Sequence, residues 1–159
     1  MSELSRRGFF GAIGAKVTNK EIVIRPPYAR EIALFGTECP QCAGMCGTMC
    51  EEEIIKFGND KTPYLDFSSS GCTDCEVCLE ACEPGVLNDK SIFIQAKVKI
   101  NATKCMSWEN VMCFSCKEPC LDDAIIFEGL FRPEISAEKC TACGFCIGRC
   151  PTGAIEIVA

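Results

Sequence analysis

The 159-residue sequence contains no histidine, a single tryptophan, two tyrosines and no long apolar segment. Without histidine there is no Ser-His or Cys-His catalytic pair, no Rieske centre and no zinc site with a histidine ligand. No apolar run approaches the roughly 18 residues of a membrane-spanning helix, so the sequence predicts no transmembrane segment. We therefore expect a protein without substrate chemistry of its own.

Charge is unevenly distributed along the chain. Residues 1–38 carry six basic and four acidic side chains, net +2, whereas residues 39–159 carry ten and eighteen, net −8. Nucleic-acid binding requires a basic surface, so the acidic body argues against it. The first segment also contains no cysteine. We predict an N-terminal extension over 1–38 and a separate functional region over 39–159.

Cysteine is the residue present in excess, with 16 copies, all of them after residue 38. A cysteine fraction above roughly 8–10% indicates a disulfide scaffold or a metal protein. The cysteines form four groups of four, separated by 21, 22 and 19 residues. In chain order the groups are Cys39, Cys42, Cys46, Cys50; Cys72, Cys75, Cys78, Cys82; Cys105, Cys113, Cys116, Cys120; and Cys140, Cys143, Cys146, Cys150. We predict that all 16 are metal ligands.

Groups two and four have the C-x2-C-x2-C-x3-C spacing of bacterial ferredoxins. In that pattern three cysteines hold one 4Fe–4S cluster and the fourth holds the neighbouring cluster. The last two cysteines are four residues apart, so one helical turn can project them to one side. Such groups work in pairs, and four groups make two pairs. The spacing leaves open whether the pairs are sequential (one with two, three with four) or nested (one with four, two with three).

Groups one and three depart from this spacing. Group three has an insert over Met106–Met112, which a loop can absorb. Group one reads C-x2-C-x3-C-x3-C, and its cysteines would also line one face of a continuous helix. We therefore predict four 4Fe–4S clusters, or three if group one is empty. Zinc fits less well because its cysteine pairs are separated by a long finger, and disulfides require an exported chain.

The segments between the groups have room only for short strands. Lys90–Asn101 alternates apolar and polar residues and is the clearest strand. Shorter candidates are Pro63–Phe67, Ala124–Phe127 and Ala154–Val158. Ala29–Phe35 predicts one or two helical turns, and the other helices are expected inside the cysteine groups. The predicted fold is α+β, with two ferredoxin-like modules of two 4Fe–4S clusters each behind a cysteine-free N-terminal extension.

Several further motifs together resemble one family. They are Ser5–Gly8 near the start, Ile24–Tyr28 before the first group, and the stretched third group, Cys105–Cys120, followed by Ala124–Phe127. The pattern resembles the NapF ferredoxin-type proteins encoded with periplasmic nitrate reductases, and the resemblance covers nearly the whole chain. One departure is the second gap of group one, which has three residues where the family has two.

The resemblance implies a cytoplasmic iron–sulfur accessory protein. Such a protein binds the catalytic subunit NapA before its export and assists its maturation, by passing electrons or an iron–sulfur cluster to it. Two alternatives remain open. One is a general polyferredoxin electron carrier that makes transient contact with redox partners and serves a membrane quinol dehydrogenase. The other is an interaction module whose clusters are structural.

The N-terminal segment contains the predicted partner contact. Arg6 and Arg7 lie beside Phe9 and Phe10, and this combination of charge and apolar anchors is typical of interface hot spots. A twin-arginine export signal fits poorly, because the apolar stretch after the arginines is short and rich in glycine. No cleavage site follows it either. We therefore expect a cytoplasmic protein.

Overall fold

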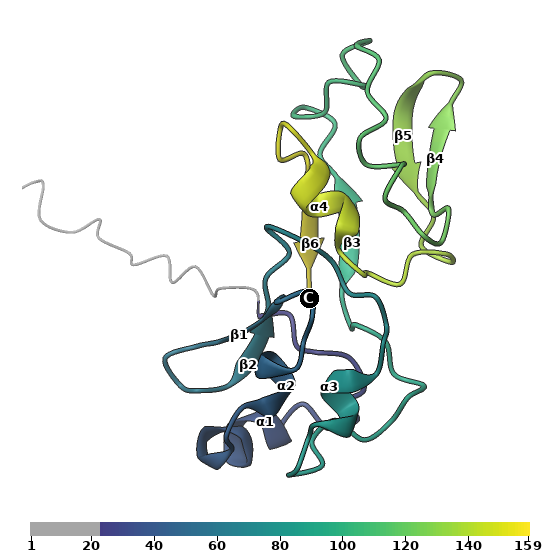
Figure 1. Ribbon diagram of the computed structural model, residues 1–159. Coiled ribbons are helices and arrows are strands. Elements are labelled where there is room, and N and C mark those ends of the chain that lie inside the picture. The colour runs from purple at the N-terminus through teal and green to yellow at the C-terminus, as the bar shows by residue number, and fades with distance from the viewer. Residues whose placement is uncertain (1–22) are drawn as a thin grey trace, which may run out of the picture.

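The structure, a computed structural model, describes residues 23–159 (Figure 1). Its helices and strands are all short. In chain order they are α1 (Leu34–Thr37), the 3-10 helix η1 (Cys39–Gln41), α2 (Met45–Thr48), β1 (Ile55–Phe57), β2 (Pro63–Leu65), α3 (Val77–Glu80), β3 (Lys97–Ile100), β4 (Ile125–Glu128), β5 (Phe131–Ile135), α4 (Phe145–Arg149) and β6 (Ile155–Val158).

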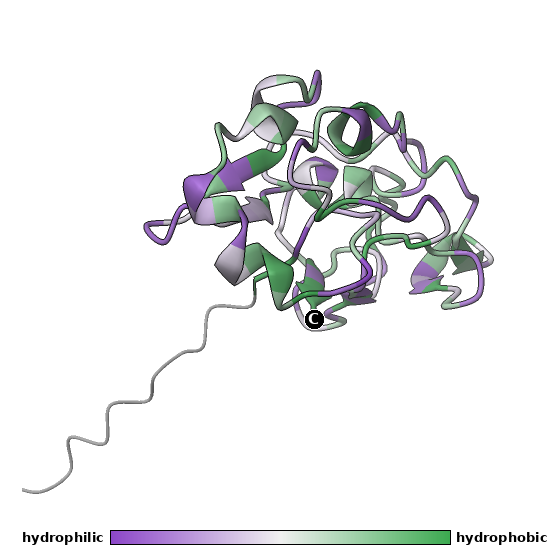
Figure 2. Cartoon of the chain, turned by 90° about the horizontal axis from the view of Figure 1, so that it is seen from below, coloured by the Kyte–Doolittle hydropathy of each residue, from purple (hydrophilic) through white to green (hydrophobic). Residues whose placement is uncertain are grey.

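These elements form two lobes, which Figure 1 shows one above the other. The first lobe contains α1, α2, α3 and the antiparallel pair β1–β2. The second contains α4 and the antiparallel pairs β3–β6 and β4–β5. Hydrophobic residues lie along the loops as well as in the helices and strands (Figure 2). The chain is therefore a small α+β protein in which loops supply much of the packing.

Two clusters of buried side chains form the core. The first includes Tyr28, Phe35 and Ile54, and the second includes Ile125 and Ile155. Val98 and Ile147 pack against both clusters, so the core runs from one lobe into the other.

A four-fold repeat in the backbone follows the cysteine groups. Three residues after the last cysteine of each group, the chain adopts a left-handed conformation and its N–H donates to that cysteine's carbonyl, at 3.0 to 3.3 Å. These residues are Glu53, Gly85, Asp123 and Gly153. Two buried residues come directly after each of them: Ile54–Ile55, Val86–Leu87, Ala124–Ile125 and Ala154–Ile155. Each group therefore ends in the same turn, which places the next two side chains in the core.

The strand predicted over Lys90–Asn101 is shorter than its alternation indicated. Only Lys97–Ile100 forms β3, and all four of its residues pair with β6. The residues before Lys97 instead contact the segment around Tyr28, since the carbonyl of Ile92 accepts the N–H of Tyr28 at 2.7 Å. The apolar residue Ile94 is buried in the first core, where it needs no sheet partner.

The other predicted elements lie close to their expected positions. β2, β4 and β6 fall within the three shorter predicted strands or one residue beyond them. The helical turns predicted over Ala29–Phe35 begin only at Leu34, because Ala29 instead forms a β-bridge with Leu87. Helices α2, α3 and α4 lie inside groups one, two and four, as predicted.

Residues 23–33 pack against the first lobe and residues 34–38 are part of it, whereas the sequence predicts an N-terminal extension over 1–38. The Arg25 guanidinium donates to the Thr62 hydroxyl at 2.7 Å and lies over the Phe35 ring, 5.2 Å from its centroid. Tyr28 and Phe35 are each 1% exposed. This part of the chain therefore helps to enclose the cysteine region. No helix within 23–159 is long and apolar enough to cross a membrane.

The burial of Phe35 generates a stability prediction. Phe35→Ala leaves a cavity in the core and removes the cation–π contact with Arg25. We expect it to lower the free energy of unfolding by about 3–5 kcal/mol. The matched control is Phe93→Ala, because Phe93 is 50% exposed and its loss should change stability by no more than about 0.5 kcal/mol. Anaerobic denaturation measures both, and equal effects would contradict the packing described here.

Candidate metal centres

The 16 cysteines gather into four sites, and each site takes thiols from two groups. Site 1 consists of Cys39, Cys42, Cys46 and Cys82; site 2 of Cys50, Cys72, Cys75 and Cys78; and site 3 of Cys105, Cys113, Cys116 and Cys150. Site 4 consists of Cys120, Cys140, Cys143 and Cys146, whose thiols lie close enough to interact electrostatically. The pairing of groups is therefore sequential, with one and two in the first lobe and three and four in the second.

The local backbone explains why each group divides between two sites. In groups one, two and four a left-handed residue stands before the short helix: Gly44 before α2, Glu76 before α3 and Gly144 before α4. That residue turns the chain after the second cysteine. The helix then separates the third cysteine from the fourth, which reaches the partner group's site.

Group one does not form the continuous helix that its spacing also allowed. Cys42 is extended, with φ −83° and ψ 152°, and Gly44 is left-handed, with φ 72°. These two residues break the helix between η1 and α2, so the extra residue in the second gap is accommodated in a loop. Group one thereby supplies three thiols to site 1, as group two does to site 2.

Apolar side chains line the sites. Phe35, Phe57 and Val86 lie around site 1, and Ile54 and Leu65 lie around site 2. Ile100, Pro133 and Ile155 lie around site 3. Such linings exclude water and lower the local dielectric constant, so a charge held there interacts strongly with its neighbours.

Burial raises the pKa of the thiols that lie deepest, and the neighbouring cysteines raise it further. The pKa of Cys46, Cys72 and Cys116 rises to about 11, and that of Cys78 and Cys146 to about 12. Four thiolates in one apolar site repel one another, and a bound cation removes that repulsion by holding the ligands deprotonated. The donor set therefore fits a metal centre.

Main-chain N–H groups point at the fourth cysteine of three groups. Leu87 donates to Cys82 Sγ at 3.4 Å, Ala124 to Cys120 Sγ at 3.3 Å, and Ala154 to Cys150 Sγ at 3.2 Å. These bonds come from the residues that follow the common turn: the first residue after it in groups three and four, and the second, Leu87, in group two. Hydrogen bonds to ligand sulfur tune the reduction potential of an iron–sulfur cluster.

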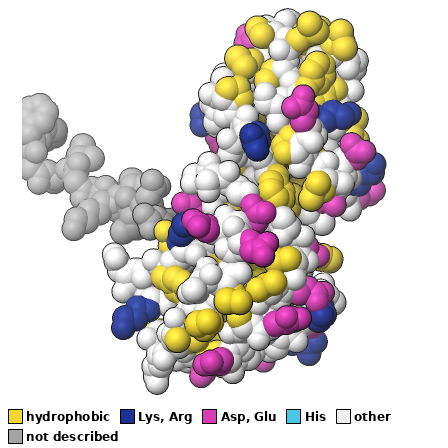
Figure 3. All heavy atoms as spheres, in the orientation of Figure 1, with side chains coloured by type: hydrophobic (Ala, Val, Ile, Leu, Met, Phe, Trp, Pro, Cys, Tyr) yellow, Lys and Arg dark blue, Asp and Glu magenta, His cyan; other side chains and the backbone are white. Residues whose placement is uncertain are grey.

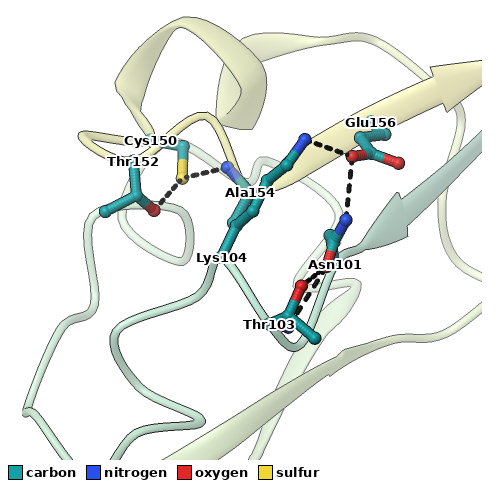
Figure 4. A network of polar contacts seen from close by, with 7 residues as sticks. All are labelled: Asn101, Thr103, Lys104, Cys150, Thr152, Ala154 and Glu156. Carbon is teal, nitrogen blue, oxygen red and sulfur yellow. Dashed lines mark hydrogen bonds and ion pairs between the residues drawn. The ribbon is translucent and has the colours of Figure 1, made fainter.

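Cys150 also has a hydroxyl partner, because its Sγ lies 3.6 Å from Thr152 Oγ1. Burial alone would raise its pKa, but hydrogen bonds from the Thr152 hydroxyl and from the N–H groups of Ala154, Thr152 and Ile155 lower it. The neighbouring Lys104 Nζ lies 2.8 Å from Glu156 Oε1, and Asn101 Nδ2 donates to the same oxygen at 3.1 Å (Figure 4). These contacts hold the residues just before Cys105, the first cysteine of group three, against β6, the strand that follows Cys150.

The structure gives two segments that the sequence had singled out a place at the metal sites. The Tyr28 hydroxyl donates to the carboxylate of Asp74, which lies between Cys72 and Cys75 in the loop of site 2. The Ile24–Tyr28 motif thus helps to shape a metal site. In the sequence, the motif is recognisable by two prolines next to a tyrosine. The second segment is the insert of group three, where Met106 lines site 3 and Trp108 Nε1 donates to the Pro133 carbonyl at 3.3 Å.

The predicted partner contacts have no structural account here. Arg6, Arg7, Phe9 and Phe10 lie outside the described residues 23–159.

The spacing of the thiols favours a cluster over a single ion. Across residues 23–159, no three side chains of Cys, Asp or Glu converge closely enough to hold one metal ion. In sites 1, 2 and 3 the four thiols instead line one cavity. A cubane cluster has an iron at each of four corners, so its cysteine sulfurs stand further apart than the ligands of one zinc ion.

Comparison with known proteins agrees with this geometry. A family model described as a 4Fe-4S binding domain matches residues 133–156, which contain all of group four. The chain is 29% identical to the ferredoxin-type protein NapF of Escherichia coli, over 96% of this chain and 93% of that protein. It is also 29% identical to the ferredoxin-type protein NapF of Haemophilus influenzae, over 95% of this chain and 89% of that one.

A solved structure gives a weaker match. It is a formate dehydrogenase–heterodisulfide reductase–formylmethanofuran dehydrogenase complex from Methanospirillum hungatei, with 22% identity and a TM-score of 0.32. The match covers 77% of this chain and 52% of that one, and this degree of overlap carries no conclusion about the lobes.

The matched domain and the four cysteine sites define a ferredoxin-type iron–sulfur protein. The similarity spans nearly the full length of the chain and confirms the resemblance carried by the sequence motifs. The chain is similar to the ferredoxin-type NapF proteins over nearly its whole length.

The sharing of cysteines between groups generates a direct prediction. Cys50→Ser should damage site 2, as Cys75→Ser does, because both thiols line that site. Cys82→Ser should instead resemble Cys42→Ser, because those thiols line site 1. Anaerobic iron analysis with electron paramagnetic resonance compares the four variants. If Cys50→Ser gave the spectrum of Cys42→Ser, the assignment of the fourth cysteines would be wrong.

Proposed function

We propose that this chain holds four 4Fe–4S clusters, one in each cysteine site, and works as an iron–sulfur accessory protein of the periplasmic nitrate reductase system. A 4Fe–4S cluster bound by four cysteines accepts and releases one electron. The observation that supports the proposal best is the presence of four thiols from two groups around each of four positions. Group one takes part like the other groups, which favours four clusters over three.

The chain's own residues give the sites what a 4Fe–4S cluster needs. Four thiols supply the ligands of every site, apolar side chains line sites 1, 2 and 3, and main-chain N–H groups donate to ligand sulfur in sites 1, 3 and 4. Each lobe thereby corresponds to a two-cluster ferredoxin module. On the face drawn in Figure 3, carboxylates and apolar side chains lie on both lobes, which suits contact with protein partners.

The biological role that fits best is assistance in the maturation of NapA in the cytoplasm, before export, by transfer of electrons or of a cluster. Its support is the likeness to NapF proteins over almost the entire chain. The second candidate is an electron carrier that serves a membrane quinol dehydrogenase, which four redox sites in one small protein also favour. Co-purification with NapA separates them, because the carrier role predicts rapid redox exchange with a membrane partner and no stable complex with NapA.

Metal content tests the number of clusters. Each 4Fe–4S cluster contains four irons and four sulfides. Four clusters therefore give about 4 × 4 = 16 iron atoms and about 16 sulfides per chain. Anaerobic iron and acid-labile sulfide analysis provides the count. About 12 of each would mean that site 1 is empty. Stoichiometric zinc without visible absorbance would refute the proposal that the sites hold clusters.

The N-terminal segment provides a test of partner binding. Deleting residues 2–15 removes Arg6, Arg7, Phe9 and Phe10 but no cysteine. We expect unchanged iron content and weaker co-purification with NapA, because that segment supplies the predicted anchors. A matched control replaces only Phe93, an exposed aromatic residue of the body, with alanine. Equal retention of NapA by the deletion variant and the full chain would move the contact to the cluster region.

A further inference from the structure

The two lobes meet through a main-chain contact between cysteines of different sites. The N–H of Cys72, in site 2, donates to the carbonyl of Cys143, in site 4, at 2.7 Å. Each residue supplies a thiol to its site, so this main-chain hydrogen bond links a ligand residue of site 2 directly to a ligand residue of site 4. The loop ahead of Cys143 also enters the first lobe, since Ala142 is buried in that lobe's core.

Three glycines make this approach possible. A Cβ on Gly71 would lie 2.5 Å from the N of Phe145 and 2.7 Å from the O of Cys143, which is closer than real Cβ contacts. A Cβ on Gly148 would lie 2.9 Å from the O of Ser68. A Cβ on Gly144, whose φ is +85°, would likewise clash with the Phe67 ring. All three glycines therefore serve the contact between lobes, a role that the sequence alone did not indicate.

Contacts within each lobe extend the connection outward. In the first lobe, Cys46 of site 1 packs against the core cluster that contains Cys78 of site 2. In the second lobe, Cys116 of site 3 and Cys146 of site 4 are buried in one core cluster. The junction joins only sites 2 and 4, so sites 1 and 3 stand at the outer ends.

We propose that the Cys72–Cys143 contact is the electron junction between the lobes, and that it arranges the four sites in one line, in the order site 1, site 2, site 4, site 3. This inference rests on the proposed function, because it requires a cluster in each site. One electron passes from site 2 to site 4, so one site is oxidised as the other is reduced, and no atom or proton is transferred. External one-electron donors and acceptors then exchange electrons at the ends of the line.

The order is tested in the full chain with two sites disabled at a time. Cys42→Ser with Cys113→Ser disables sites 1 and 3, and Cys75→Ser with Cys140→Ser disables sites 2 and 4. After anaerobic reduction with dithionite, electron paramagnetic resonance detects spin–spin coupling between neighbouring clusters. We expect coupling in the first protein and its loss in the second. Uncoupled clusters at sites 2 and 4, or coupled clusters at sites 1 and 3, would overturn the order.

A second set of variants tests the junction without removing a ligand. Gly71→Ala forces the lobes apart, and Phe67→Ala loosens the packing on Gly144. Both should retain full iron and sulfide but lose part of the coupling seen in the unmodified chain. The matched control is Gly36→Ala, since a Cβ there meets nothing within 4 Å. Coupling equal to that of the control, at full iron content, would refute the junction, whereas an unmodified chain without iron and sulfide would refute the proposed function instead.

Discussion

Each cysteine group sends three thiols to one site and its fourth thiol to the site of its partner group, so no group can complete a site alone. The rest of the structure depends on this exchange. Two segments separated by 21 residues in the first lobe, or by 19 in the second, must meet before either site has four ligands. The common turn after the fourth cysteine then places two apolar residues in the core, and in groups two, three and four an N–H that follows it donates to the sulfur. Metal binding and core formation are therefore parts of one process.

Much of the site could be predicted from spacing. Three thiols within seven residues fit one corner of a cluster, and a fourth thiol four residues later cannot return to it. The choice between sequential and nested pairing could not be predicted, because the gaps between groups are nearly equal in length. That choice depends on packing in the lobes, where Ile54 and Val86 bury their side chains together.

The sequence was least informative where the chain lacks regular structure. Alternation over Lys90–Asn101 indicated a long strand, yet residues before Lys97 bind the N-terminal segment through Ile92 and bury Ile94 without a sheet. The Ile24–Tyr28 motif carried family resemblance, but its contacts with Thr62 and Asp74 depend on tertiary packing. The position of Gly71, Gly144 and Gly148 between the lobes is likewise visible only in the structure.

We infer that the metal sites hold the fold together, and removal of the metal by chelation tests this inference most directly. The chain should be stripped of iron anaerobically and followed by circular dichroism with amide hydrogen exchange. We predict loss of native signal and of protection across residues 39–159, because nothing then holds the cysteines of two groups together in one site. A metal-free chain with a native spectrum and a cooperative melting transition would contradict it.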